Sequence, residues 1–283
     1  MSRSILKIVK GVDKIEGLGM SIKRTLGLKE MRNFTPFLLV DHFKNQASGS
    51  GFAPHPHKGH ETITYVLSGQ IHHSDFTGSR GVIDKGDLQF MTAGKGIVHA
   101  ETPKGGLVEG LQIWVDLPVA LKEVEPSYRN LIGKDTPVVR SSNLSEIRVI
   151  SGESNGISNK RELAQIPIEY YHMTLGAGAD FKQEVKRGHN SFIYVIHGQL
   201  EVAGKEVPEH SSVFFDEDGD FIAGKTPEGA EFVILTGQKL DQEIHMMGTF
   251  VEASRDKLKD SLKSYKNKTG GFSRLRDPSY NFS

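Results

Sequence analysis

Cysteine is absent from this chain of 283 residues. Its absence excludes disulfides, thiolate metal ligands and a cysteine nucleophile. An excess of charge of one sign is also missing, because 35 lysines and arginines balance 35 aspartates and glutamates. With no net field, electrostatics favour neither a nucleic acid nor a membrane surface as a partner. We therefore expect no direct binding to nucleic acid.

Long apolar segments are missing as well. No uninterrupted run approaches the ~20 residues that span a bilayer. Residues 1–10 carry too short an apolar run for a signal peptide. We expect no membrane partner and an intracellular location, in the cytoplasm, the nucleus or both.

Glycine, in contrast, is abundant, and its 31 residues separate short β-rich runs. Examples are residues 37–40, 63–67, 81–83, 88–91 and 111–115. Short β segments between Gly, Asp and Asn turns, with no alternating helical pattern, are typical of an all-β sandwich or barrel. The charged, irregular segment 120–137 interrupts this pattern. We interpret it as a connector between two domains, residues 1–134 and 135–283.

The second half of the chain repeats the first. Residues 191–200 align with residues 62–71 at an offset of 129, the difference between positions 62 and 191. The offset places His189 on His60 and Gly198 on Gly69. A second echo is the Gly-Asp pair at 219–220, which we align with the pair at 86–87. The pattern predicts a duplicated β-barrel unit.

A helix is expected near the C-terminus. Ser254 is a suitable N-cap for residues 255 to about 266. Leu258, Leu262 and Tyr265 would share one apolar face, and the glycines at 270–271 would stop the helix. We interpret the segment as a tail helix packed on a barrel.

The main functional pattern is a pair of chemically active side chains two residues apart, found twice. His55 and His57 precede the apolar run 62–67, and His99 and Glu101 lie on a later β-rich run. Residues two apart on a strand share a face. Two such strands would bring three imidazole nitrogens and one carboxylate together, which makes a site for a divalent transition metal.

The residues around this set leave two questions. Glu61 is either a further ligand or an acceptor for an imidazole N–H, or a solvated strand start, and we weigh these readings about evenly. In the second copy, Glu184 and Lys186 stand where His55 and His57 stand in the first. An ammonium group would repel a divalent cation, so we expect the metal only in the N-terminal domain.

These residues resemble the pirin family of bicupins. The resemblance extends over nearly the whole chain and is carried by residues 33–43 (NFTPFLLVDHF), 55–62 (HPHKGHET), 86–101 (GDLQFMTAGKGIVHAE) and 110–115 (GLQIWV), with weaker matches over 191–198 and 248–251. The resemblance implies two tandem cupin domains, each a jelly-roll β-barrel, followed by the short C-terminal helix. It also implies that His55, His57, His99 and Glu101 bind one metal, usually Fe2+, although other divalent transition metals suit these ligands.

Three positions depart from the family pattern. His60 stands where a bulky apolar residue is common, Lys58 where arginine is frequent, and Thr249 where proline is frequent. They leave the ligand set intact, and they bear on the shape of the substrate pocket and on the groups that surround the ligands.

The family resemblance implies two kinds of activity. The first is that of a quercetin 2,3-dioxygenase, which opens a flavonol such as quercetin with O2 and releases carbon monoxide. Our own hypothesis is that a metal lowers the pKa of the flavonol hydroxyl and that Glu101 swings from ligand to general base. The alternative is an iron-dependent transcriptional co-regulator that binds a protein partner and has little or no turnover. A third reading is a structural metal in an inactive protein. We expect a monomer in each case.

Overall fold

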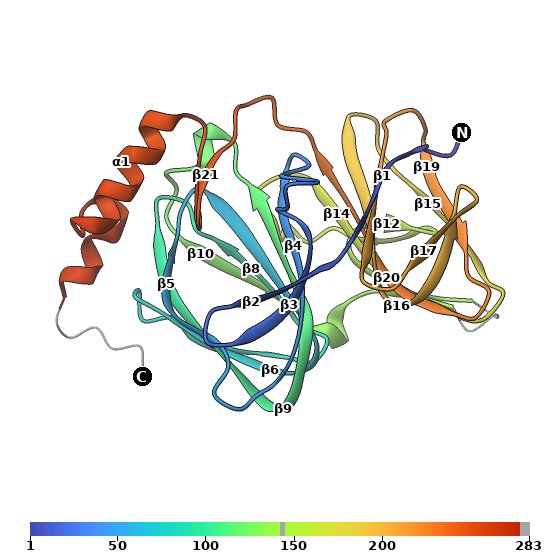
Figure 1. Ribbon diagram of the computed structural model, residues 1–283, viewed down its shortest axis with the longest axis horizontal. Helices are drawn as coiled ribbons and strands as arrows, with labels where there is room; N and C mark the ends of the chain where they lie inside the picture. The colour runs from blue at the N-terminus through green and yellow to red at the C-terminus, as the bar shows by residue number, and fades with distance from the viewer. Residues whose placement is uncertain (142–144, 278–283) are drawn as a thin grey trace. The chain divides into compact units, whose positions relative to one another are not determined.

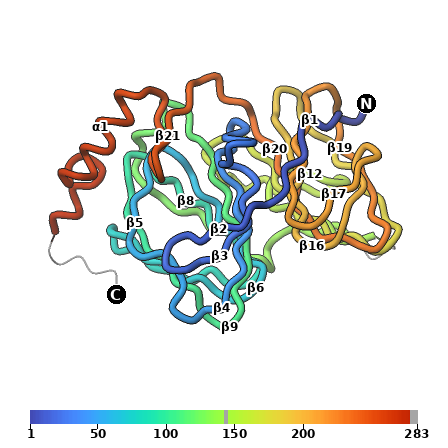
Figure 2. The backbone as a smooth tube through the Cα atoms, viewed as in Figure 1, coloured from blue at the N-terminus to red at the C-terminus, as the bar shows by residue number. Residues whose placement is uncertain are grey.

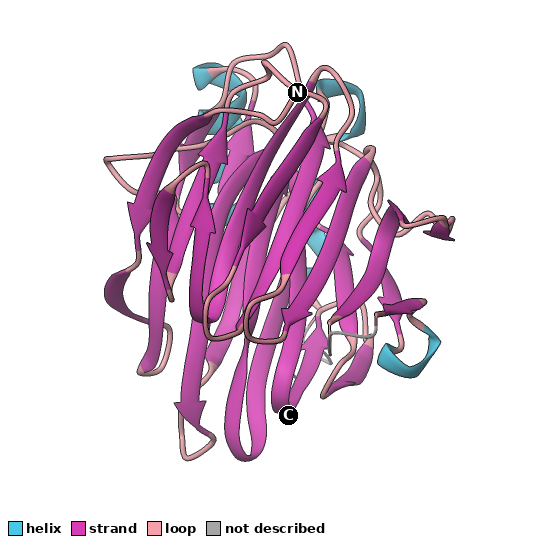
Figure 3. Cartoon of the chain, turned by 90° about the vertical axis from the view of Figure 1, so that its right-hand side faces the viewer, coloured by secondary structure: helices cyan, strands magenta, loops and turns pink. Residues whose placement is uncertain are grey.

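A computed structural model describes residues 1–141 and 145–277 of the chain. Strands make up most of the described ribbon, and helical turns occur at only a few places (Figure 3). The expected all-β class is therefore confirmed. Within the described residues, no helix is both long enough and apolar enough to cross a membrane.

The chain divides into two compact units, each built around one sheet. The N-terminal unit comprises residues 13–22, 40–133 and 240–283, and the C-terminal unit comprises residues 1–12, 23–39 and 134–239. Each unit has its own buried apolar clusters, one of which lies inside the C-terminal sheet around Val195 and Phe232.

Most of a nine-stranded sheet belongs to the described part of the N-terminal unit (Figure 1), while residues 12, 23–26 and 37–39 of its strands are counted with the C-terminal unit. Its strands are β2 (Val12–Glu16), β3 (Met20–Leu26), β4 (Phe37–Gln46), β5 (Phe52–His57), β6 (His60–Asp75), β7 (Arg80–Asp84), β8 (Leu88–Thr92), β9 (Ile97–Asp116) and β10 (Ser127–Leu131). The order is β10-β8-β6-β9-β4-β3-β2, with β5 on β9 and β7 on β6. Short 3-10 turns follow at η1 (Val119–Leu121) and η2 (Gly133–Asp135).

The described part of the C-terminal unit holds an eleven-stranded sheet. Its strands are β1 (Ile5–Lys10), β11 (Val138–Arg140), β12 (Glu146–Ser154), β13 (Ile157–Asn159), β14 (Ile168–Leu175), β15 (Asp180–Glu184), β16 (His189–Val202), β17 (Lys205–Pro208), β18 (Ser211–Phe215), β19 (Phe221–Lys225) and β20 (Ala230–Gln238). The order is β1-β18-β16-β20-β14-β12-β11, with β13 on β12, β17 on β16, and β19 between β15 and β16.

The predicted internal repeat is confirmed at the level of backbone irregularities. The register of β6 on β9 shifts between Val66 and Ser68, and that of β16 on β20 shifts between Val195 and His197. The two shifts are 129 positions apart in the numbering. The glycines that follow, Gly69 and Gly198, have φ of 73° and 77°. Residues that carry a side chain rarely adopt this left-handed backbone conformation, so both copies need glycine at this bend.

One detail of the predicted repeat is wrong. The pair at 86–87 precedes β8, whereas the pair at 219–220 follows β18 and precedes β19. The bond that the Gly86 N–H donates to the Val66 carbonyl, at 2.7 Å, has its counterpart in the bond from the His210 N–H to the Val195 carbonyl, also 2.7 Å. His210 has φ of 58°. The predicted alignment of 219–220 with 86–87 was wrong because the true counterpart of Gly86 is His210, a histidine in the left-handed conformation that glycine adopts in the first copy.

The predicted tail helix is confirmed as α1 (Arg255–Lys266). The Ser254 hydroxyl accepts a hydrogen bond from the Lys257 N–H at 3.3 Å, as expected of an N-cap. Leu258 is buried, and Leu262 and Tyr265 pack beside it in a cluster with residues of β8 and β9. In Figure 2 the tail lies beside β5 of the same unit.

The tail differs from expectation at its end. The helix stops at Lys266, before the glycines, and Gly270 opens a 3-10 helix, η3 (Gly270–Arg276). A Cβ on Gly271 would lie 2.1 Å from the Lys95 carbonyl oxygen. This glycine therefore permits close packing of the tail on its own unit and is not the helix terminator.

The expected sequential division into residues 1–134 and 135–283 differs from the compact units at both ends of the chain. β1 pairs with β18 and so joins the C-terminal unit. Strands β21 (His245–Met247) and β22 (Phe250–Glu252) and helix α1 join the N-terminal unit. The physical reason is that strand pairing attaches β1 to β18, and apolar packing attaches α1 to its cluster with β8 and β9, regardless of position along the chain.

Candidate metal centre

Strand pairing places the two predicted ligand pairs side by side. β5 runs antiparallel to β9, with His55 opposite His99 and His57 opposite Ile97. Side chains directly opposite each other in an antiparallel pair have Cβ atoms about 4.5–5.5 Å apart. The imidazole rings of His55 and His99 have their centroids 4.5 Å apart. His57 joins them because it lies two residues from His55 on the same face of β5.

The three imidazoles form a compact cluster. Each offers one ring nitrogen, and these three atoms lie within 4.8 Å of one another. The Nε2 atoms of His55 and His99 are 3.1 Å apart. His57 and His99 are buried, and His55 is partly exposed. The cluster therefore has one wall open toward solvent, on the side of His55.

Burial keeps these imidazoles uncharged. It lowers the pKa of His57 and of His99 well below the usual histidine value, and repulsion from the neighbouring imidazoles lowers each further. Burial also lowers the pKa of His55. A histidine must be neutral to bind a metal, so the cluster is in the ligating form at neutral pH.

Glu101 is the carboxylate nearest the expected set. One of its oxygens lies 4.0 Å from the His99 Nε2, and its side chain is 11% exposed. Burial raises the pKa of Glu101 to about 7. Imidazole nitrogens suit divalent transition metals such as iron, nickel, copper and zinc, and the group within 4.8 Å comprises the three histidines, with Glu101 beside it. The residues present therefore fit such a metal.

The structure resolves the position of His60 and Glu61. His60 is fully buried, and its Nε2 lies 3.1 Å from the His57 Nδ1. Glu61, on the opposite face of β6, is also fully buried; it accepts a hydrogen bond from the Thr92 hydroxyl at 2.7 Å and lies 3.9 Å from Arg129. The reading of Glu61 as a solvated strand start is therefore wrong, and its contacts with Thr92 and Arg129, on the face of β6 away from His60, do not support the reading as a metal ligand or an imidazole acceptor.

Two further residues near the cluster were given no role by the sequence reasoning. The Trp114 ring lies edge-on to His57, with centroids 5.3 Å apart, and 4.8 Å from His60. Its buried Nε1 has no hydrogen-bond partner within the described residues. His73 contributes to the low pKa of His99 and contacts Gln89 at 2.9 Å. Trp114 could have been suspected, because it is the one tryptophan and pairs with Thr62 across β6 and β9.

The C-terminal barrel offers a direct structural counterpart. β15 runs antiparallel to β19, and Glu184 lies opposite Phe221, as His55 lies opposite His99. Lys186, at the position that matches His57, forms an ion pair with Glu169 at 2.8 Å. An acid, an ammonium and a phenyl ring thus stand where the N-terminal barrel has three imidazoles.

Comparison with known proteins decides the family. The family model "Pirin" matches residues 19–115, and "Pirin C-terminal cupin domain" matches residues 170–271. Human Pirin is 35% identical over 97% of this chain and 96% of its own. The chain belongs to the pirin family.

Solved structures agree with this membership. A crystal structure of quercetin 2,3-dioxygenase from Acinetobacter baumannii is 26% identical, with a TM-score of 0.89 over 95% of this chain and 98% of that chain. Bacterial pirin YhhW from Escherichia coli, in complex with nickel(II), is 20% identical, with a TM-score of 0.67 over 83% of this chain and 99% of its own. This second likeness concerns the fold alone. The expected fold of two cupin domains with a short C-terminal helix is confirmed.

Proposed function

We propose that this pirin-family chain is a metal-dependent dioxygenase of the quercetin 2,3-dioxygenase type. His55, His57, His99 and Glu101 would bind one divalent transition metal, with Fe2+ as the first candidate. The observation that carries the proposal is the cluster of three ring nitrogens within 4.8 Å, with a buried carboxylate 4.0 Å from His99. The likeness to the Acinetobacter dioxygenase supports the choice of substrate class.

A bound metal would supply Lewis-acid and redox chemistry and would lower the pKa of a flavonol hydroxyl at the site. Glu101 would swing from ligand to general base and accept the proton of the 3-hydroxyl, because its carboxyl lies 4.0 Å from His99 and burial raises its pKa when no metal holds it. The three imidazoles would hold the site in shape. Trp114, beside His57, would form an apolar wall against an aromatic substrate.

The reaction balances without an external reductant. Both atoms of O2 enter the ring-opened product, on the two carbons that flank C3. The two ring bonds of C3, to C2 and to C4, break, and C3 leaves with its hydroxyl oxygen as carbon monoxide. The proton taken from the hydroxyl by Glu101 is returned to the product.

The proposal is tested with protein loaded with Fe2+ under anaerobic conditions. Quercetin loss and carbon monoxide release are measured after O2 is admitted, for the native protein, His55→Ala and Glu101→Gln. We expect His55→Ala to lose activity together with the metal, and Glu101→Gln to lose turnover. Unchanged turnover in both variants would exclude this site as the catalyst. Lys186→Ala, in the other barrel, is the matched control and should retain activity.

A second candidate function is regulatory binding of a protein partner with little turnover. The observation that favours it is the 35% identity with human Pirin across almost the whole chain. This function predicts that capture of a partner depends on whether the protein is ferrous, ferric or metal-free. A pull-down that compares the three states, alongside the quercetin assay, separates the two functions.

A further inference from the structure

His60 connects the imidazole cluster to the backbone of a tight turn. It opens β6, two residues beyond Lys58, and its imidazole is fully buried. One ring nitrogen, Nε2, lies 3.1 Å from the Nδ1 of His57, and the other, Nδ1, lies 3.1 Å from the Lys58 carbonyl oxygen. His60 therefore has both nitrogens engaged, one toward the cluster and one away from it.

The carbonyl that His60 meets is held from several sides. The Lys58 carbonyl also accepts the Val251 N–H at 3.0 Å, and the Lys58 N–H donates to the Thr249 carbonyl at 3.2 Å. The neighbouring turn fits the tail closely, because a Cβ on Gly59 would lie 1.9 Å from the Val251 oxygen. Thus β22 fixes the oxygen against which His60 is oriented.

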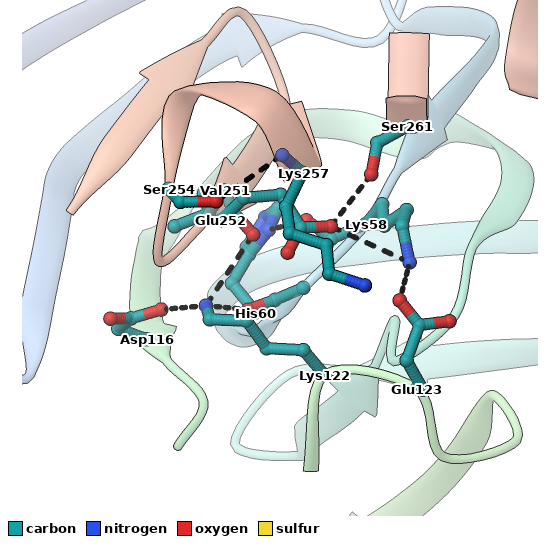
Figure 4. A network of polar contacts seen from close by, with 11 residues as sticks. Lys58, His60, Asp116, Lys122, Glu123, Val251, Glu252, Ser254, Lys257 and Ser261 are labelled. Carbon is teal, nitrogen blue, oxygen red and sulfur yellow. Dashed lines mark hydrogen bonds and ion pairs between the residues drawn. The ribbon is translucent and has the colours of Figure 1, made fainter. Parts of the chain in front are cut away.

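Charged side chains around this turn reinforce it (Figure 4). The buried Lys122 ammonium donates to the Gly59 carbonyl at 2.8 Å and to the Asp116 carboxylate. The Lys58 ammonium pairs with Glu123 at 2.7 Å and with Glu252 at 3.5 Å. Because His60 is fully buried and the Lys122 ammonium acts on it, a protonated His60 would be unfavourable, so His60 is a neutral imidazole with one donor and one acceptor.

The directions of the two hydrogen bonds follow from this neutrality. A carbonyl oxygen only accepts, so the His60 Nδ1 must carry the proton. Its Nε2 is then an acceptor, and the bond to His57 requires that the His57 Nδ1 donate. The lone pair of His57 is consequently left on Nε2, the ring atom that faces away from His60.

We propose that His60 is a positioning residue that holds His57 in the Nδ1–H tautomer and so presents its Nε2 to the imidazole cluster. The inference rests on the proposed metal site, where His60 acts only through His57. Hydrogen bonds of this kind to a ligating histidine fix both its tautomer and its ring orientation. The turn at residues 58–60 and the tail segment 249–252 thereby become part of the support of the metal centre.

The other two imidazoles provide internal references. His55 has its Nδ1 2.9 Å from the Ala53 carbonyl, so a backbone oxygen sets its tautomer independently of His60. His99 has a buried Nδ1 with no partner in the described part of the chain. A change at His60 should therefore alter His57 and leave His55 unchanged.

The decisive test needs no metal. Long-range 1H–15N NMR correlations of the metal-free protein report which nitrogen of each histidine carries the proton, and His57→Gln assigns the His57 signals. We expect Nδ1–H for His57 in the native protein. His60→Phe, which keeps a ring but removes both hydrogen bonds, should shift His57 toward Nε2–H, with His55 unchanged. His60→Gln should restore Nδ1–H, because its amide oxygen accepts and its amide nitrogen donates.

The same variants are then titrated with Co2+ in competition with a chelator. We expect His60→Phe to weaken Co2+ binding by about 10- to 100-fold, the usual effect of losing such a supporting bond, and His60→Gln to recover most of it. The matched control is His189→Phe, because His189 opens β16 as His60 opens β6, in the barrel that lacks the cluster. It should leave the Co2+ affinity unchanged.

The outcomes separate this inference from the proposed function. An Nε2–H tautomer of His57 in the native protein overturns the inference, as does a His60→Phe variant with native tautomer and affinity. If His60→Phe fails to fold, the native tautomer and the His60→Gln spectrum still decide. A native protein that binds no Co2+ but shows Nδ1–H His57, shifted in His60→Phe, would refute the metal site and not the role of His60.

Discussion

The two barrels share their irregularities but not their chemistry. Both retain the register shift and the left-handed glycine after it. Both also contain a histidine–glutamate pair at 2.9 Å: His42 with Glu109, which is buried, and His172 with Glu231, in which the glutamate is 32% exposed. The two glutamates occupy equivalent places, because Glu109 pairs with Ser68 and Glu231 with His197, and these partners are 129 positions apart. The imidazole cluster, in contrast, has no counterpart within the described residues of the second barrel.

The difference shows which features the fold itself requires. A buried carboxylate such as that of Glu109 cannot lose its hydrogen-bond donor without the cost of an unsatisfied buried group, which is about 1–3 kcal/mol or more. A bend that needs positive φ cannot lose its glycine without strain. The imidazole cluster has no such constraint, since Glu184 on β15, Phe221 on β19 and Lys186 just beyond β15 replace it in an intact barrel. The scaffold and the proposed metal site are therefore separable in this protein.

The largest expected effect is the loss of metal on removing one imidazole. His57→Ala should bind less than a tenth of one metal per chain, because it deletes one of three clustered nitrogens, while Lys186→Ala should bind as much as the native protein. Elemental analysis of protein purified without added metal measures both. Equal metal contents in His57→Ala and the native protein would remove the contrast between the barrels.

The next prediction converts the second barrel. Glu184→His, Lys186→His, Phe221→His and Ala223→Glu together reproduce the proposed ligand set on β15, just beyond its end and on β19, where Glu184 faces Phe221 as His55 faces His99. We expect the metal content to rise from one to two per chain, counted by Co2+ titration. An unchanged content, in a variant with a native circular dichroism spectrum, would mean that ligands on matching strands are insufficient without support such as His60 provides.

Much of this contrast could be predicted from sequence. Strand alternation can be read from neighbouring residues, and the repeat can be read by comparing the two halves of the chain. The pairs at 55 and 57 and at 99 and 101 predicted ligand neighbours, and the structure brings the three imidazoles together. The repeat offset found the second-barrel replacements of His55 and His57 but misaligned the 219–220 pair, since a histidine at 210 fills a glycine-like position. The roles of His60 and Glu61 depend on which face of β6 each occupies and on a tail about 190 positions away, and no local pattern contains that information.

Removal of the metal should lower the unfolding temperature of the native protein, and this effect is smaller than the changes in metal content above. A ligand that binds only the folded state stabilises it by about 2.7 kcal/mol at a free concentration 100 times its dissociation constant. Excess Co2+ should therefore raise the unfolding temperature of the native protein, and a chelator should reverse the shift. His57→Ala should show no shift. The same rise in His57→Ala would indicate binding elsewhere on the chain.

The smallest expected effect concerns acid stability and the shared histidine–glutamate pair. Burial alone would raise the pKa of Glu109, but hydrogen bonds from His42 and Lys44 outweigh it and bring the pKa to about 2. An unfolded glutamate has a pKa of about 4.3. Because the folded value is the lower one, the stabilisation is complete above the unfolded pKa and is lost as the pH falls toward 2.

Urea unfolding midpoints at pH 6 and pH 3.5 measure this dependence. The native protein should lose stability between the two, and Glu109→Gln should lose less, since an amide does not titrate. The Gln variant should also be less stable at pH 6, because Lys44 and His42 lose their anionic partner. If the two proteins have parallel pH dependence, the Glu109 pair does not contribute to acid sensitivity, and the resemblance between the barrels at this position is one of shape and not of charge.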